Sequence, residues 1–248
     1  MSRWPVLDRA PVELPTLDDH EYTFWDTLLE LADLRPREWT LIGGQMVLVH
    51  ATEAGVRPQR LSTDLDILVN ARVVTGGVRE FVQAIEGRGF VLAGASPQGV
   101  AHRYRRDRVS IDVLAPEGLG PRTDVTTTPP GHTVQVPGGT QALNRTELLP
   151  IAAGPAQGLL PRPSLLGALV VKAAAVVVDD VPDDQRSDLA LLLSLIQQPI
   201  ELRDKLSSKD KQRIRARCEM LDPLHRAWSQ LPTSQADRGR AALRLLVG

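Results

Sequence analysis

A short apolar run that stops at two glycines, WTLIGG (39–44), restricts the fold more than any other feature of the sequence. A strand that breaks on Gly-Gly is followed here by a pattern typical of a helix, over about 45–54. The next segment, LSTDLDILV (61–69), alternates so that every second residue would share one face of a strand. Strand, glycine turn, helix and second strand in close succession predict a mixed α+β domain.

The rest of the chain divides into a mixed part and a helical part. Helices over 17–34 and 76–88, a strand over 90–94, a hairpin turning at 107–108 and a short edge strand TVQV (133–136) are expected before Pro161 and Pro163. After these prolines the periodicity is helical, with helices over about 164–178, 184–196 and 234–246, and over 200–218 with a break allowed for within it. The prediction is therefore an α+β domain with a mixed sheet over 1–160, followed by a helical bundle domain over 161–248.

Composition excludes several classes of protein. In 248 residues, 42% are hydrophobic and 24% charged, which is ordinary for a globular protein, and no apolar run is long enough to span a membrane. The N-terminus lacks the pattern of a signal peptide, so we expect a cytoplasmic protein. Cys218 cannot form an internal disulfide, and no Cys/His set has zinc spacing. The basic tail, 201–248, suits either a polyanion or a solvated helical face.

Three aspartates interrupt strands that are otherwise apolar. Asp64 and Asp66 lie two residues apart, so both carboxylates emerge on one face, and Asp112 lies in a second expected strand, VSIDVLAP. Three neighbouring carboxylates repel one another unless a divalent cation lies between them, and Mg²⁺ prefers such oxygen ligands. The alternative is that Asp-x-Asp simply lies on an exposed strand face or in a turn.

Lysine is rare in this chain, which draws attention to Lys172. Of 29 basic residues only four are lysines, and Lys172 is the one among the first 200 residues, in the apolar stretch LLGALVVKAAAVVV. A compact ammonium at this place is a candidate for binding a ligand, because a planar guanidinium cannot replace it. The alternative is a lysine whose stem is buried and whose charge reaches solvent.

These motifs together resemble a known family. The segment GGQMVLVHATEAGVRPQRLSTDLDILV resembles the signature of the nucleotidyltransferase superfamily with the DNA polymerase β-type fold. More narrowly, the Arg-x-Ser-x-Asp-x-Asp form at 60–66, with Lys172 and the later RSDLALLL (186–193), is similar to the AbiEii/MenT group of nucleotidyltransferase toxins. The resemblance covers roughly residues 41–196.

The resemblance implies a nucleotide site with bound magnesium. Three carboxylates would serve as metal ligands, one of them also as the base: Asp64, Asp66 and Asp112. Three residues would border the triphosphate: Gly43, Gly44 and Ser62. A glycine turn at a helix start suits this role, because it lets backbone N–H groups approach phosphate oxygens closely. In some relatives the matching serine is phosphorylated by an antitoxin, and a dianion there would exclude metal and nucleotide.

Three further residues match the family pattern. Lys172 would neutralise the phosphates, and Asp188 would orient Lys172 or the incoming nucleophile. As an alternative, Asp188 is a carboxylate that stabilises a helix start. Arg60 would either bind phosphate or pair with the aspartate strand. The sequence departs from the relatives in the acidic stretch DDVPDD (179–184), where a more basic linker is common.

The expected activity is transfer of a nucleoside monophosphate from an NTP to an RNA acceptor, by family resemblance the tRNA 3′ end. The protein would be the toxin of a bacterial toxin–antitoxin or phage-defence pair, with a cognate antitoxin as partner and no membrane partner. The arginines of RYRRDR (103–108) suit an RNA backbone or a salt-bridged surface hairpin. Two alternatives remain open. In the first, the enzyme uses another acceptor, either a small molecule such as an aminoglycoside or a protein hydroxyl. In the second, the protein is a non-catalytic nucleotide-binding module.

Overall fold

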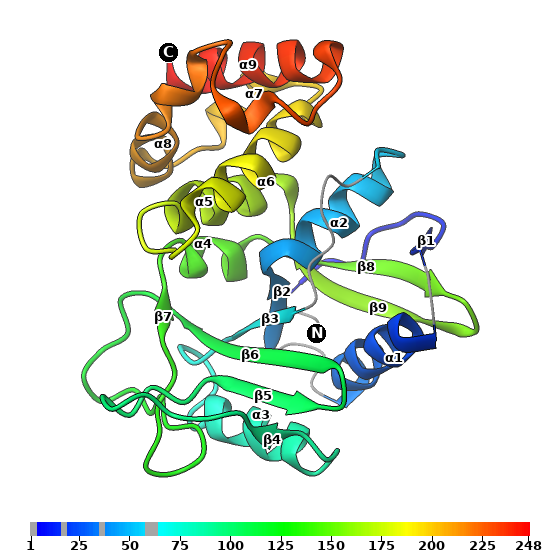
Figure 1. The fold of residues 1–248 in the computed structure, drawn as a ribbon, viewed down its shortest axis with the longest axis vertical. Helices are drawn as coiled ribbons and strands as arrows, with labels where there is room; N and C mark the ends of the chain where they lie inside the picture. Colours follow the sequence, from blue (N-terminus) through cyan, green and yellow to red (C-terminus); the bar gives the residue numbers. More distant parts are fainter. Residues whose placement is uncertain (1–3, 16–18, 35–37, 58–63) are drawn as a thin grey trace.

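A computed structural model describes residues 4–15, 19–34, 38–57 and 64–248. The strands lie at one end of the molecule and the last helices at the other (Figure 1). The strands are β1 (Val12–Glu13), β2 (Trp39–Ile42), β3 (Asp64–Val69), β4 (Val91–Leu92), β5 (Arg103–Arg106), β6 (Val109–Pro116), β7 (Gln135–Val136), β8 (Thr146–Ala153) and β9 (Ala156–Pro163). The α-helices are α1 (Asp19–Leu34), α2 (Gly43–Glu53), α3 (Gly77–Glu86), α4 (Gly139–Asn144), α5 (Leu165–Ala175), α6 (Pro182–Ser194), α7 (Pro199–Asp204), α8 (Ser208–Arg215) and α9 (Thr233–Val247).

The larger sheet is mixed, as the sequence predicts. Its strand order is β2-β3-β6-β5-β4, and β7 pairs with the end of β6. Strand β3 runs antiparallel to β2 and parallel to β6, and β5 is antiparallel to β6. The apolar residues of the alternating strands are buried, for example Leu65, Ile67 and Ile111 at 0% exposure. The α+β fold class and the hairpin at 107–108 are confirmed.

A second sheet, β1-β8-β9, was not predicted from the sequence. Strands β8 and β9 form a long antiparallel hairpin, and α1 packs against β9. Prolines at 150, 161 and 163 hide these strands, because proline lacks the N–H that a strand interior donates. Strand β9 tolerates its prolines because it lies at the edge of the sheet. The helical part therefore begins at Leu165, and residues 161–163 belong to a strand.

The C-terminal part is helical, and α5 packs on α6, which in turn packs on α9. The helix expected over 200–218 is broken, because α7 ends at Asp204 and α8 starts after a capping box between Ser207 and Asp210. Helix α2 also contacts α5 and α6, so it joins the two parts of the molecule (Figure 1). In the described part of the chain, none of the helices has the length and apolar character of a membrane span.

Candidate functional site

Strand register brings the predicted carboxylates together. The Cα atoms of Asp66 on β3 and Asp112 on β6 are direct partners in the parallel pairing. Asp64 lies two residues before Asp66, so its side chain leaves the same face of the sheet. Asp112 is buried, whereas Asp64 and Asp66 are partly exposed. Three carboxylates from adjacent strands thus share one face near the edge of the buried core.

The glycine turn closes against Asp66. Strand β2 ends at Ile42, whose Cα pairs with that of Asp66, so Gly43 at the start of α2 lies beside the same carboxylate. Gly43 has φ +71°, and a Cβ atom there would lie 1.7 Å from Asp66 Oδ2. No side chain larger than hydrogen fits. The turn therefore places the first residues of α2, Gly43 and Gly44, directly at the carboxylates.

Arg103 pairs with two of the three carboxylates. Its Nε donates to Asp112 Oδ1 at 2.7 Å and its Nη2 to Asp112 Oδ2 at 2.6 Å. The same Nη2 lies 3.6 Å from Asp64 Oδ2. The bidentate hydrogen bond to Asp112 raises the pKa of Arg103 above its ordinary value. The sequence indicated arginines near this site but not this ion pair.

Burial and the neighbouring charges act together on the pKa of Asp66. Burial raises the pKa of Asp66 to about 7, the Asp112 carboxylate raises it too, and Lys172 lowers it. Asp64 adds to the increase, and Arg103 opposes it. The site therefore favours the binding of additional positive charge.

The residues present fit a hard divalent cation in their chemistry. All three carry oxygen ligands of the kind Mg²⁺ prefers, and burial together with the neighbouring Asp112 carboxylate raises the pKa of Asp66. Even so, no group of three or more His, Cys, Asp or Glu side chains within residues 4–15, 19–34, 38–57 and 64–248 is arranged so that it could hold a metal ion. In this arrangement the guanidinium of Arg103 covers both oxygens of Asp112.

Lys172 lies in a buried polar cluster beside this face. Its Nζ is 2.7 Å from Asp188 Oδ2 on α6 and donates to Gln185 Oε1 at 2.9 Å. Gln185 Nε2 in turn donates to Asp179 Oδ2 at 2.6 Å. Because Lys172 also lowers the pKa of Asp66, its charge acts on the carboxylate site. The buried position of Lys172 rules out the alternative in which its charge reaches solvent.

Two predicted site residues and part of the arginine cluster need separate mention. Arg60 and Ser62 lie outside the residues that the structure describes. In the hairpin, Arg106 packs over the Phe90 ring at 4.6 Å and donates to Thr27 Oγ1 at 2.8 Å. Arg106 thus packs the hairpin against Phe90 and Thr27 through contacts that are not salt bridges.

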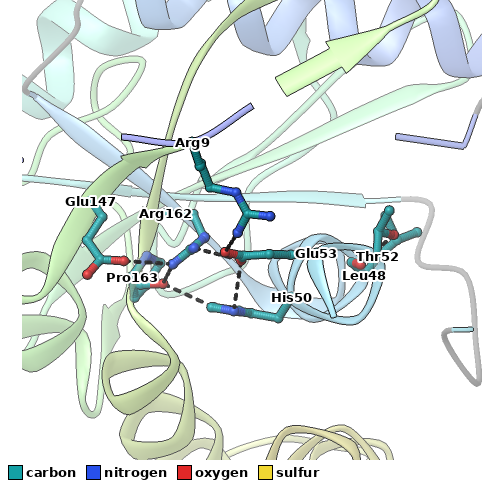
Figure 2. A network of polar contacts seen from close by, with 8 residues as sticks. All are labelled: Arg9, Leu48, His50, Thr52, Glu53, Glu147, Arg162 and Pro163. Atoms are coloured by element: carbon teal, nitrogen blue, oxygen red, sulfur yellow. Dashed lines mark hydrogen bonds and ion pairs between the residues drawn. The ribbon is translucent and has the colours of Figure 1, made fainter. Parts of the chain in front are cut away.

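A second polar network holds the opposite end of α2 (Figure 2). Arg162 on β9 is buried, with its Nη2 2.7 Å from Glu53 Oε2 and its Nη1 3.0 Å from Glu147 Oε2. Arg9 also pairs with Glu53, and His50 Nε2 donates to Pro163 O at 3.0 Å. Burial lowers the pKa of His50 well below its ordinary value, and the Arg162 charge lowers it as well. The network fixes α2 to the second sheet, and with it the glycine turn.

Sequence reasoning missed this network and the roles of Gln185 and Arg103. Only His50 and Glu53 carried a signal, because residues three apart on a helix share a face. Their partners Glu147 and Arg162 lie on strands that were not predicted, so no spacing could connect them. A cleft of about 890 Å³ beside this network is lined in part by Arg145, Arg162 and Lys205.

Comparisons with known proteins give similarities in structure alone. No protein-family model matches the chain, and none of the curated proteins matches it significantly. An antigenic nucleotidyltransferase-like protein from Paracoccidioides brasiliensis is similar at 13% identity, over 86% of this chain and 94% of that one, with a TM-score of 0.49. The antibiotic-resistance factor ANT(2'')-Ia, solved in solution, is similar at 14% identity over 92% and 93%, with a TM-score of 0.36.

A crystal structure of ANT(2")-Ia in complex with adenylyl-2"-tobramycin is similar at 12% identity, over 91% of this chain and 97% of that one, with a TM-score of 0.34. The Paracoccidioides brasiliensis protein is described as nucleotidyltransferase-like, and the narrower resemblance of this chain to AbiEii/MenT toxins stays a prediction. Likeness at this level assigns no activity to the chain, which has to be inferred from the site's own residues.

Proposed function

We propose that this protein is a magnesium-dependent nucleotidyltransferase that transfers a nucleoside monophosphate from an NTP to a hydroxyl acceptor and releases pyrophosphate. One observation carries the proposal: the register that pairs Asp66 with Asp112, adds Asp64 on the same face and sets the Gly43 turn against Asp66. Carboxylates, a glycine turn and a nearby ammonium at one place are the groups that nucleotidyl transfer requires.

Each group has a role in the proposed reaction. Asp64, Asp66 and Asp112 would hold Mg²⁺, which supplies charge stabilisation at the transferring phosphoryl group. The backbone N–H groups at Gly43 and Gly44 would approach the triphosphate, where a side chain would clash. A carboxylate of the trio would accept the proton of the attacking hydroxyl, whose oxygen forms the new bond to the α-phosphorus as the bond to pyrophosphate breaks.

Lys172 would act on the developing phosphate charge, held by Asp188 and Gln185. A lysine fixed by two hydrogen-bond acceptors keeps its ammonium in one place and loses little entropy on binding phosphate. Ser62 and Arg60 would complete the phosphate end of the site, as the resemblance to the nucleotidyltransferase toxins implies.

For the acceptor, we propose an RNA 3′ end, and with it a role as the toxin of a toxin–antitoxin pair. This finer proposal rests on the resemblance of residues 41–196 to the AbiEii/MenT group. A cationic small molecule is the second candidate, favoured by the acidic turn between α5 and α6. There Asp179 is hydrogen-bonded to Gln185, the same side chain that holds Lys172.

The test is label transfer by the full-length chain. The protein with Mg²⁺ and each [α-³²P]NTP is incubated with separate pools of tRNA, protein and aminoglycosides, and pyrophosphate release is followed in parallel. We expect label in one pool, lost in Asp66→Asn and Lys172→Ala and kept in the surface controls Asp204→Asn and Lys209→Ala. Label in no pool, or equal label in the Asp66 and Lys172 variants, would contradict the proposed function.

A further inference from the structure

Strand register builds a cation into the carboxylate face. Arg103 on β5 is the direct Cα partner of Asp112 on β6, and Asp112 is in turn the partner of Asp66 on β3. Paired residues in a sheet project from the same face, so the guanidinium rises beside the carboxylates by backbone geometry. The fold therefore places Arg103 beside Asp112, and the rotamer of the Arg103 side chain completes the ion pair.

The contacts of Arg103 lie where a divalent cation would have to bind. Its fork covers both oxygens of Asp112, at 2.7 and 2.6 Å, and its Nη2 faces Asp64 Oδ2 at 3.6 Å. Mg²⁺ needs carboxylate oxygens at about 2.0–2.1 Å in near-octahedral geometry. A carboxylate oxygen can accept a hydrogen bond and bind a cation at the same time. A guanidinium and a dication on the same two Asp112 oxygens would, however, lie close enough to repel each other, so binding of the dication weakens the Arg103–Asp112 pair.

The exposure of the two partners indicates which of them moves. The Arg103 side chain is 40% exposed, whereas that of Asp112 is 9% exposed. A long arginine side chain with this much access to water can rotate outward, whereas Asp112 is held within the sheet. Departure of Arg103 would leave three carboxylates facing one another, which is an arrangement that a dication stabilises.

We propose that Arg103 is a built-in counter-ion that occupies Asp112 and Asp64 in the metal-free protein and is displaced when a divalent cation binds. This inference rests on the proposed function, because it concerns the metal site of that reaction. In this proposal Arg103 sets the affinity for the metal, because its guanidinium competes with the cation for Asp112 and Asp64. Metal binding then exchanges one guanidinium for one dication, and until the cation arrives Arg103 offsets part of the repulsion among the carboxylates.

The test measures Mn²⁺ binding without nucleotide. The full-length protein is freed of metal with a chelator and titrated with Mn²⁺, and free Mn²⁺ is followed by its electron paramagnetic resonance signal. We expect Arg103→Gln to bind Mn²⁺ about tenfold more tightly than the wild type, the ratio expected for loss of a partly exposed bidentate competitor. Arg103→Lys keeps the charge without the fork and should lie between the two.

Arg105→Gln is the matched control. Arg105 lies two residues along β5 on the same face, so the charge removed is the same, but its nearest hydrogen-bond partner is Ser110, at 3.4 Å. Its Mn²⁺ affinity should equal that of the wild type. Adding Asp66→Asn to the wild type or to Arg103→Gln should abolish Mn²⁺ binding. This result would show that the measured Mn²⁺ binds at the carboxylate site. Thermal unfolding of each variant checks that the fold is retained.

The outcomes separate this inference from the proposed function. Unchanged or weaker affinity in Arg103→Gln, or equal tightening in Arg105→Gln, overturns the competition and leaves the metal site intact. Absence of an Asp66-dependent site in the wild type and in Arg103→Gln overturns the inference together with the metal in the proposed function.

A second readout follows the guanidinium directly. The ¹H–¹⁵N signal of Arg103 Nε is assigned by its absence in Arg103→Lys, and Mg²⁺ is then added. We expect this signal to shift or broaden in proportion to metal occupancy, because the hydrogen bond to Asp112 Oδ1 is lost. A signal that stays unchanged while the site fills with Mg²⁺ would contradict displacement.

Discussion

The ammonium of Lys172 lies 2.7 Å from the carboxylate of Asp188, and both side chains are buried, at 3% and 6% exposure. Removing Asp188 takes away the carboxylate that pairs directly with the buried ammonium, and water does not reach Lys172 to replace it. We therefore expect Asp188→Leu to lower the free energy of unfolding by roughly 3–5 kcal/mol. Urea unfolding of the full-length chain measures this loss.

The double variant Lys172→Met/Asp188→Leu is the control for this pair. Replacing both charges with apolar groups of similar size should restore most of the lost stability, because no unpaired charge remains. Nucleotide transfer should stay absent, since Lys172 is gone. If the double variant is as unstable as Asp188→Leu, the loss of stability comes from altered packing and not from an unpaired buried charge.

Gly43 offers a test of the close approach to Asp66. Gly43→Ala adds a Cβ atom 1.7 Å from Asp66 Oδ2 and 2.5 Å from its Cγ, so the turn or the carboxylate must move. Activity should be lost, and the free energy of unfolding should fall by more than 2 kcal/mol, on the order of an overpacked core. Gly55→Ala is matched, since Gly55 has φ +66° but nothing within 4 Å of the added atom. It should lose only about 1 kcal/mol, and equal losses in both variants would count against the clash.

The ionised carboxylate of Asp66 should lower the free energy of unfolding of the metal-free protein. Its pKa is raised to about 7, so the folded state binds the proton more tightly than the unfolded state, where the value is 3.8. Stability from this group therefore falls as pH rises from about 4 to about 7, and the loss persists above pH 7. Asp66→Asn should raise Tm at pH 8 in chelator by roughly 2–4 °C per kcal/mol regained. A lower Tm would show that the charge is well compensated.

His50 predicts a pH dependence of opposite sign. Burial, with Arg162, keeps its pKa well below the ordinary 6.5, so the folded state holds His50 neutral, with Nε2 donating to Pro163 O. Below about pH 6.5 the unfolded chain binds a proton that the folded chain does not. Stability from this group is therefore lost as pH falls through 6.5, by up to about 1.4 kcal/mol per pH unit.

The substitution His50→Gln replaces the imidazole N–H donor with an amide N–H donor and removes the titratable group. Urea unfolding between pH 7 and pH 5 should show a shallower loss of stability than in the wild type. Equal slopes in wild type and His50→Gln would place the acid sensitivity elsewhere.

The central strands and the aspartate face were predictable because their signals are local. Alternation in 61–69 and 109–116 fixed which side of each strand is apolar, and the β3–β6 pairing then brings Asp66 to Asp112. Lys172 could be singled out as a candidate site residue because lysine is rare in this chain and this one lies in an apolar stretch. These are properties of single segments, which short-range patterns report well.

What the sequence did not reveal depends on contacts between distant segments. The β8–β9 hairpin was hidden by its prolines, which only the edge position of β9 makes acceptable. Arg162 could be linked to Glu53 and Glu147 only once that hairpin was in place. The hydrogen bonds from Arg103 to Asp112 depend on the register of β5 against β6. A shift of one residue would turn the arginine side chain to the other face of the sheet.

The most direct test of the account is a crystal structure of the full-length protein with Mn²⁺ and a non-hydrolysable NTP, read from the anomalous signal of the metal. We expect a manganese peak within coordination distance of Asp66 and Asp112, with the triphosphate between the Gly43 turn and Lys172. A nucleotide bound in the cleft beside Arg145 and Arg162 instead, or a metal peak away from the aspartates, would contradict it.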